Sequence, residues 1–214
     1  MKSQKSEKII LCVLLAVPIT LSSMCDWVKA RFYIDHMERD ERLNVIQVER
    51  VVDTLQITAG STLADIGSGS GLFTRHLANR VDPGVVYAVD INSELLEHID
   101  DTAKKQRIDN IKTVQASEDD PNLPRSVDLI FICDTLHYIH FPDRYVNKLR
   151  SYVDEGGQIA IINFFRNWPP MSNRFERKQL ESWMHQAGFV LKAEHDFLED
   201  RYFLIFERQA TVRG

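Results

Sequence analysis

The chain has 214 residues, of which 27% are charged and 44% are hydrophobic, and this composition is typical of one folded domain with an extension. The formal net charge of −5 provides no global positive field, so we expect no nucleic-acid partner. Three scattered cysteines, Cys12, Cys25 and Cys133, lack the spacing of a zinc site or a disulfide framework, and no metal site is expected.

The first 30 residues have the pattern of a targeting segment. Lys2, Lys5 and Lys8 precede an apolar run over residues 9–21, which is the layout of a signal peptide or a short membrane anchor. Ser22, Ser23 and Asp26 follow, so a full membrane span is marginal. We expect membrane association through residues 9–25, and the alternative is export after cleavage near residues 28–30.

Residues 31–57 are predicted to contain a connector and an N-terminal helix. Residues 33–40 are charged and aromatic without a clear period, which suits a connector lying against the fold or a substrate lid. Residues 41–55 carry apolar side chains at spacings of three and four, and these predict a single amphipathic helix.

From residue 58 to residue 210, strand and helix patterns alternate. The sequence predicts strands at 62–66, 85–89, 111–114, 127–133 and 158–164, and helices at 72–81, 93–107, 143–153 and 174–187. Ser93 is the expected N-cap of its helix, and the glycine pair 156–157 is expected to end the helix 143–153. Residues 189–197 and 202–206 predict a terminal antiparallel pair. The fold class is therefore α/β, a three-layer, doubly wound, Rossmann-like fold with a mostly parallel seven-stranded sheet and a terminal antiparallel strand.

A glycine-rich loop joins the first predicted strand of this region to the next helix. Gly67, Gly69 and Gly71 allow a tight turn and a close approach of the backbone to a ligand. A dinucleotide fingerprint needs its third glycine at position 72, which is Leu72, so a dehydrogenase is disfavoured. Asp65 would repel a pyrophosphate but suits a ligand that carries an ammonium group, directly or through water. S-adenosylmethionine offers that ammonium, and its carboxylate can meet the start of the helix.

A second acidic residue ends the next predicted strand. Asp90 lies about 20 residues after the glycine loop, where a carboxylate accepts both hydroxyls of an adenosyl ribose. With Ser93 as the helix cap, Asp90 is expected to face the ligand.

These motifs resemble class I S-adenosylmethionine-dependent methyltransferases over about residues 45–208. Residues 63–71 look like motif I of that family, and residues 87–90 look like the acidic loop after its second strand. Residues 123–130, 134–142 and 156–159 are similar to the approach to the fourth strand, the segment that leaves it, and the turn into the fifth strand. The resemblance implies a methyltransferase domain over residues 58–210 and S-adenosylmethionine as the methyl donor.

The resemblance also implies further cofactor contacts. Ile91 follows Asp90 and is assigned to the cofactor site, and Asp134 is expected to meet the methionine amino group. Family members often carry an Asp-Ala pair after the third strand, whose Asp reaches the adenine amino group. This chain departs from that pattern, and Ser117 or Glu118 is expected to accept the hydrogen bond instead.

Methyl transfer from a sulfonium is an in-line displacement that needs alignment and, for a protonated nucleophile, removal of a proton. His137, just past the fourth strand, is the candidate base or substrate-orienting residue, and a packed structural histidine is the competing interpretation. Tyr138 is the second catalytic candidate, followed by His140 and residues 166–168. The acceptor is expected to be a small molecule or a lipid-like molecule.

Other functions stay open at this stage. Aminopropyl transfer uses a related fold, but no acidic pair suited to a polyamine stands out. A non-catalytic protein that binds S-adenosylmethionine or a partner with the same fold is the main alternative. The lysines before the apolar run favour a cytoplasmic N-terminus and therefore export of the domain, whereas the cofactor is made in the cytosol. Lys29 and Arg31 follow the run and weaken this difference in positive charge between its two ends. We expect the site to lie on the side of the membrane that supplies the cofactor.

Overall fold

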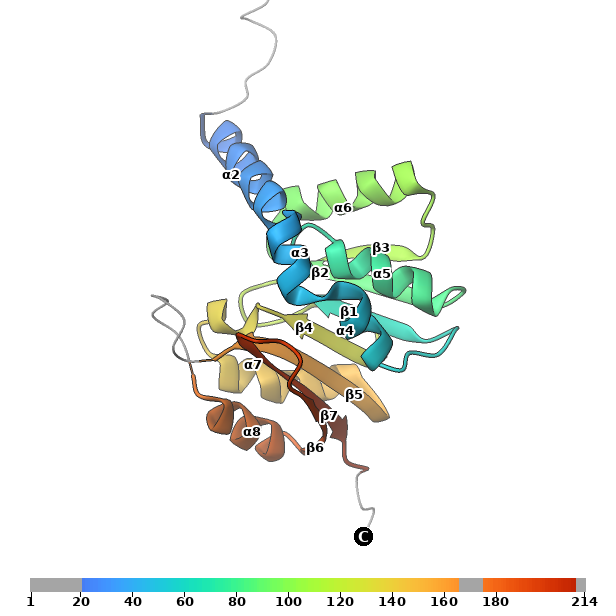
Figure 1. The fold of residues 1–214 in the computed structure, drawn as a ribbon, viewed down its shortest axis with the longest axis vertical. Coiled ribbons are helices and arrows are strands. Elements are labelled where there is room, and N and C mark those ends of the chain that lie inside the picture. Colours follow the sequence, from blue (N-terminus) through green and yellow to red (C-terminus); the bar gives the residue numbers. More distant parts are fainter. Residues whose placement is uncertain (1–20, 166–174, 211–214) are drawn as a thin grey trace, which may run out of the picture.

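A seven-stranded sheet forms the centre of the computed structural model, which describes residues 21–165 and 175–210 (Figure 1). The strand order is β3-β2-β1-β4-β5-β7-β6, the first five being parallel, and β7 runs antiparallel between β5 and β6. This topology confirms the predicted mostly parallel sheet with an antiparallel end. The strands are β1 (Thr62–Ile66), β2 (Val85–Asp90), β3 (Ile111–Gln115), β4 (Val127–Cys133), β5 (Val153–Phe164), β6 (Phe189–His195) and β7 (Arg201–Arg208).

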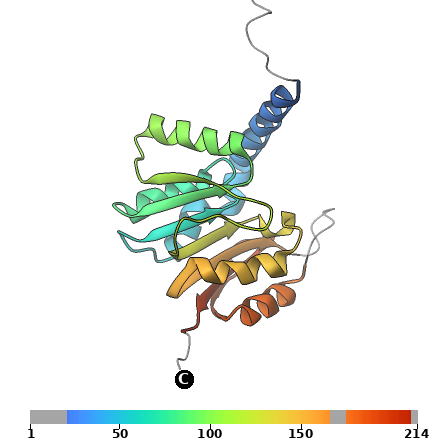
Figure 2. The same cartoon turned by 180° about the vertical axis from the view of Figure 1, so that it is seen from behind.

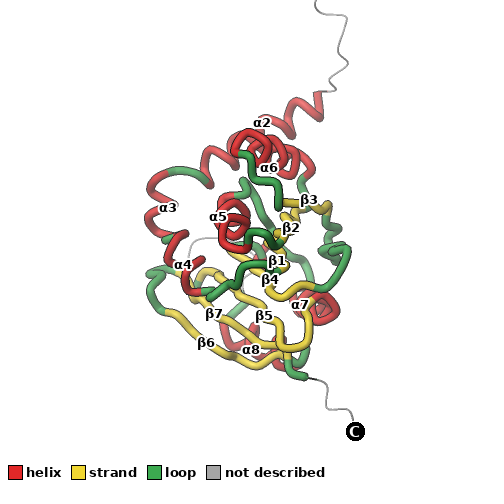
Figure 3. The backbone as a smooth tube through the Cα atoms, turned by 90° about the vertical axis from the view of Figure 1, so that its right-hand side faces the viewer, coloured by secondary structure: helices red, strands yellow, loops and turns green. Residues whose placement is uncertain are grey.

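Helices cover both faces of the sheet, because its strands are apolar on both sides. Leu63 of β1 belongs to a core shared with α4 (Val48–Thr54) and α5 (Leu72–Val81). Its neighbour Ala64 belongs to the opposite core, shared with α7 (Pro142–Leu149) and α8 (Arg177–Gln186), which Figure 2 shows from behind. On the first face, α6 (Ser93–Gln106) covers Ala88 of β2. The edge-on view of Figure 3 shows the resulting three layers.

The helix predicted over residues 41–55 is in fact two helices, α3 (Asp40–Ile46) and α4. Gln47 separates them with a left-handed backbone (φ 47°), and its side-chain amide donates to the carbonyl of Phe197 at 2.9 Å. The break turns Ile46 into the core, fully buried, and leaves Val45 46% exposed. A contact with a segment 150 residues away has therefore overridden the local helical period.

The helix predicted over residues 143–153 ends early. It stops at Leu149, a 3₁₀ turn (η2, Arg150–Tyr152) follows, and Val153 already pairs with Val127 of β4. Gly156 and Gly157 therefore lie inside β5 and do not end the helix. At Gly157 a Cβ would lie 2.9 Å from the carbonyl oxygen of Asp128, so close strand pairing explains that glycine.

Two other helix starts differ from prediction. Ser93 does not cap α6. Asn92 does, its side-chain oxygen accepting from the N–H groups of Glu94 at 2.9 Å and Leu95 at 3.4 Å. The helix expected from residue 174 begins at Arg177, after a capping box formed by Glu176 and Gln179.

The N-terminal helix α2 (Leu21–Met37) crosses the boundary expected after residue 30 and extends beyond the sheet beside α6 (Figure 1). Ala30 is 3% exposed and packs with Ile34 against Leu95 of α6, so the connector is helical and lies against the fold. The expected cleavage site at residues 28–30 falls within this helix. In the stretches 21–165 and 175–210, no helix is long and apolar enough to span a membrane. Residues 1–20, with most of the expected anchor, lie outside the described residues.

Candidate functional site

The candidate site lies at the carboxyl edge of the parallel strands, and its centre is the glycine loop between β1 and α5. Gly67, Gly69 and Gly71 all have left-handed backbones, with φ of 73°, 56° and 77°. A Cβ on Gly67 would lie 2.1 Å from the hydroxyl oxygen of Thr135, and one on Gly69 would lie 2.7 Å from the sulfur of Met37. Backbone conformation and close packing therefore both require glycine at these positions.

Asp90 lies beside this loop at the end of β2 and is 9% exposed. Its Oδ2 accepts from the N–H of Gly69 at 3.0 Å, and its Oδ1 accepts from the N–H of Asn92 at 2.9 Å. A carboxylate has about four lone-pair sites, so these two bonds leave acceptor capacity for ribose hydroxyls. Ile91, the next residue, is 56% exposed and presents an apolar side chain at the same strand end.

Asp65 is a buried carboxyl group beneath the glycine loop. It is 3% exposed, and the Thr74 hydroxyl of α5 donates to it at 2.6 Å. Burial raises the pKa of Asp65 to about 7, and the nearby charge of Asp90 acts in the same direction, while the bond from Thr74 opposes them. Asp65 therefore lies at the glycine loop, but the residue that hydrogen-bonds to its carboxyl group is Thr74 of α5.

The residues of the loop fit S-adenosylmethionine. The Ser68 hydroxyl is buried, and no hydrogen-bond partner for it exists within residues 21–165 and 175–210. Asp90 would hold the ribose hydroxyls, while the N-terminus of α5 offers partial positive charge to the methionine carboxylate. The donor set therefore matches a ligand with an adenosyl ribose at one end and an amino-acid group at the other.

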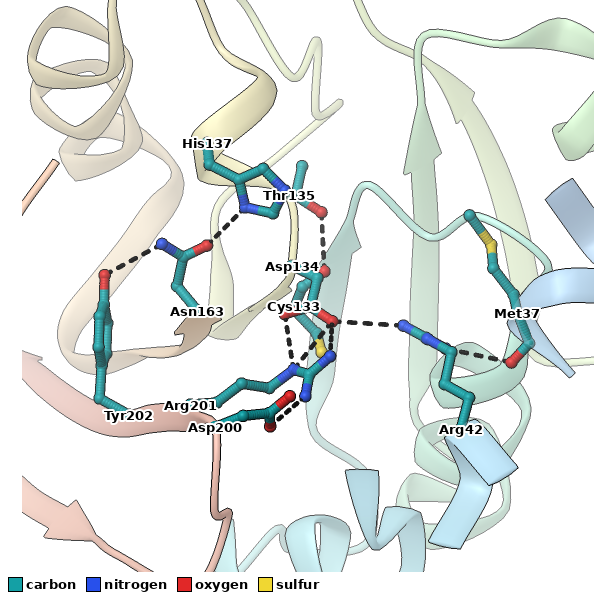
Figure 4. A network of polar contacts seen from close by, with 10 residues as sticks. All are labelled: Met37, Arg42, Cys133, Asp134, Thr135, His137, Asn163, Asp200, Arg201 and Tyr202. Carbon is teal, nitrogen blue, oxygen red and sulfur yellow. Dashed lines mark hydrogen bonds and ion pairs between the residues drawn. The ribbon is translucent and has the colours of Figure 1, made fainter. Parts of the chain in front are cut away.

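Asp134 is the centre of an ion-pair cluster that the sequence did not predict (Figure 4). It has a left-handed backbone (φ 52°), and Arg201 reaches both of its carboxylate oxygens at 2.9 to 3.1 Å. Arg42 of α3 approaches Oδ2 at 3.5 Å, and Asp200 pairs with Arg201 on its other side. The carboxylate expected at the methionine amino group is thus already held by two arginines.

His137 belongs to a second buried cluster at the same edge (Figure 4). It lies in the 3₁₀ turn η1 (Leu136–Tyr138), is 3% exposed, and its Nδ1 is 2.8 Å from Oδ1 of Asn163. The Asn163 amide in turn donates to the Tyr202 hydroxyl at 3.1 Å. The structure agrees with both interpretations of His137. The side chain is packed, as a structural histidine would be, and it lies at the functional edge, as a base or substrate-orienting residue would.

The remaining candidates are exposed or lie outside the described residues. Tyr138 is 65% exposed with its ring centroid 4.3 Å from that of His137, and His140 is exposed. Ser117 and Glu118 are exposed, and the Ser117 hydroxyl donates within its own turn, to Asp119 at 3.2 Å and to the carbonyl of Asp120 at 3.3 Å. Residues 166–168 lie outside the described residues.

Sequence reasoning missed Arg42, Asn163, Arg201 and Tyr202. One signal was available for Tyr202. The first residues of an antiparallel strand lie at the same sheet edge as the last residues of the parallel strands, so the start of the predicted strand 202–206 belonged to the edge at which the predicted strand 158–164 ends.

Known proteins resemble this chain in both sequence and fold. Residues 64–159 match the model of a family described as a methyltransferase domain. The ubiquinone/menaquinone biosynthesis C-methyltransferase of Hahella chejuensis is 25% identical over 130 residues, covering 58% of this chain and 51% of that protein. The malonyl-[acyl-carrier protein] O-methyltransferase 1 of Ilyobacter polytropus is 28% identical over 129 residues, covering 56% and 47%. The chain thus spans about half the length of these relatives.

The fold is shared with a SAM-dependent methyltransferase from Aquifex aeolicus. The two structures superpose with a TM-score of 0.73 at 21% identity, covering 81% of this chain and 96% of the other. At this identity the likeness concerns the fold, and it extends well beyond the stretch that matches the family model.

Proposed function

We propose that the chain is a class I, S-adenosylmethionine-dependent methyltransferase that transfers a methyl group to a small-molecule or lipid-like acceptor, because residues 64–159 match a methyltransferase domain and the fold is shared with such an enzyme. The observation that carries the proposal is the loop of three left-handed glycines with the Asp90 carboxylate bonded across it. These residues form a cradle for an adenosyl ligand at the strand edge where such sheets bind their ligands.

The reaction needs alignment more than activation. When bound, the donor would supply a methyl group already activated on a sulfonium sulfur, and that sulfur would keep the C–S electron pair when the acceptor's nucleophilic atom takes the methyl carbon. His137 takes up the proton of the acceptor or orients it, and Tyr138, which is 65% exposed with its ring centroid 4.3 Å from that of His137, contacts the acceptor.

A lipid-soluble acceptor agrees with two features. One relative is named for ubiquinone and menaquinone biosynthesis. In this chain, α2 exposes Val28, Phe32 and Tyr33 by 54%, 63% and 51%, directly after an apolar N-terminal run. Aromatic side chains on a helix that continues an apolar segment suit the membrane–water interface. We therefore propose that α2 keeps the domain at a membrane surface, on the side that supplies the cofactor.

Flotation with vesicles of phosphatidylethanolamine and phosphatidylglycerol tests this location. The full chain is expected to float, and the joint substitutions Phe32→Ser and Tyr33→Ser are expected to reduce the floated fraction. A full chain that stays with the soluble fraction would refute the membrane proposal and leave methyl transfer untouched.

Methyl transfer itself is tested with methyl-labelled S-adenosylmethionine and two acceptors, an isoprenoid quinol and malonyl-acyl carrier protein. We expect labelled quinol together with adenosylhomocysteine. His137→Ala should lower the rate by about 10²-fold or more, whereas His185→Ala, at an exposed histidine of α8, should change it by less than about threefold.

A non-catalytic cofactor-binding or partner-binding protein is the alternative. The occupied carboxylate of Asp134 favours it, because the arginines leave less capacity for the donor's amino group. Tight cofactor binding without any adenosylhomocysteine across both acceptors would support this alternative over methyl transfer.

A further inference from the structure

Three buried polar side chains from separate segments form one hydrogen-bonded chain at the functional edge. His137 follows β4, Asn163 lies near the end of β5, and Tyr202 lies at the start of β7, and they are 3%, 2% and 2% exposed. Burying polar groups costs free energy unless each finds a partner, so a connected set of three fixes its members in one arrangement.

The strand register holds the middle of this chain rigidly. Asn163 and Tyr202 are direct cross-strand partners in the antiparallel pair of β5 and β7. The Tyr202 ring also packs against Phe165, with centroids 5.9 Å apart. Burial raises the pKa of Tyr202 to about 12, so its hydroxyl stays protonated at physiological pH and accepts the Asn163 amide proton.

The orientation of the Asn163 amide has a chemical consequence for His137. Because Nδ2 donates to Tyr202, Oδ1 is the atom that faces the imidazole, 2.8 Å from Nδ1. An amide oxygen only accepts, so Nδ1 of His137 carries the ring proton. In the neutral ring, Nε2 then carries the lone pair.

We propose that Asn163, supported by Tyr202, is a positioning residue that holds His137 as the Nδ1–H tautomer, so that Nε2 accepts the acceptor's proton during methyl transfer. The role of Nε2 rests on the proposed function. The tautomer itself is inferred from the hydrogen bonds of Asn163 and does not depend on the proposed function. The charged groups near His137 include Arg201 and Asp134, which form an ion pair, so their charges offset one another. The guanidinium carbon of Arg201 lies 3.8 Å from the centroid of the Phe164 ring, and His137 packs against the same ring.

The tautomer is measured on the full chain labelled with ¹⁵N-histidine, by two-bond ¹H–¹⁵N correlation above the pH at which the ring is charged. His137→Gln assigns the signals. We expect a protonated Nδ1 and an unprotonated Nε2 in the wild type. A protonated Nε2 would mean that the Asn163 amide is reversed, and it would overturn the inference even if methyl transfer is found.

Two substitutions then separate positioning from packing. Asn163→Leu removes the acceptor and should allow Nε2 protonation, with kcat lowered about tenfold or more. Asn163→Asp keeps an oxygen facing Nδ1, so it should keep the wild-type tautomer and retain kcat within about threefold. An Asn163→Leu variant with the wild-type tautomer would refute the role of Asn163. If no acceptor is methylated, the tautomer result still decides the structural part.

Discussion

The two sides of the functional edge are built in different ways. Around β1 and β2, the candidate cofactor site consists largely of backbone: three left-handed glycines and a carboxylate that accepts two backbone N–H groups. Around β4, β5 and β7, the edge consists of side-chain clusters centred on Asp134 and Asn163, which join residues up to 92 positions apart. The first side depends on local geometry, and the second depends on the whole sheet being assembled.

This difference suits two tasks. A donor that is the same in every turnover can be held by a fixed backbone cradle, whereas side chains from several segments can vary with the acceptor. We therefore expect cofactor binding to depend on the β1–β2 side and the transfer step to depend on the β4–β5–β7 side, while substitutions on either side can lower stability.

The largest effect is expected at Gly67. Gly67→Ala combines a positive φ with a Cβ only 2.1 Å from Thr135, so the free energy of unfolding should fall by about 4 kcal/mol. Gly156→Ala is the matched control, since Gly156 also has a positive φ, of 77°, but nothing lies within 4 Å of its added Cβ. The free energy of unfolding of the control, measured by urea denaturation, should fall by about 1 kcal/mol. Equal losses would show that backbone strain, and not packing on Thr135, requires the glycine.

The next effect is expected in the Asp134 cluster. Arg201→Gln leaves the Asp134 carboxylate without its bidentate partner in a largely buried site, and should lower the free energy of unfolding by about 3 kcal/mol. Arg42→Gln removes a longer, 3.5 Å contact from a side chain that is 23% exposed, and should cost less than about 1 kcal/mol. Similar losses in the two variants would contradict the central role of Arg201.

The last effect is a pH dependence at Asp65. Its pKa of about 7 in the folded state exceeds the ordinary value of 3.8, so between these values the folded chain holds a proton that the unfolded chain releases. Stability should therefore decrease as pH rises from 4 to 7, with a slope that approaches about 1.4 kcal/mol per pH unit, and level off above that range. Asp65→Asn should flatten this slope, while Asp109→Asn, at an exposed carboxylate, should keep it. A slope unchanged by Asp65→Asn would exclude Asp65 as its source.

The sequence predicted the β1–β2 side better than the opposite side, for a physical reason. Glycines at 67, 69 and 71 and an acid at 90 act through nearby backbone, so their spacing is visible in one stretch of chain. Asn163 and Tyr202 meet through β5–β7 pairing, and Asn163 and Arg201 reach His137 and Asp134 only once β4, β5 and β7 lie in one sheet. No local pattern encodes these contacts. The break at Gln47 and the early end of α7 were missed for the same reason, since a distant carbonyl and a strand partner decide them.

The most direct test of this division is a calorimetric titration of S-adenosylmethionine into the full chain and two variants. Asp90→Ala, on the β1–β2 side, should weaken cofactor affinity at least about tenfold. Asn163→Leu, on the other side, should leave affinity within about twofold. Unchanged affinity in Asp90→Ala, or equal losses in both variants, would contradict a cofactor site built on the glycine loop and Asp90.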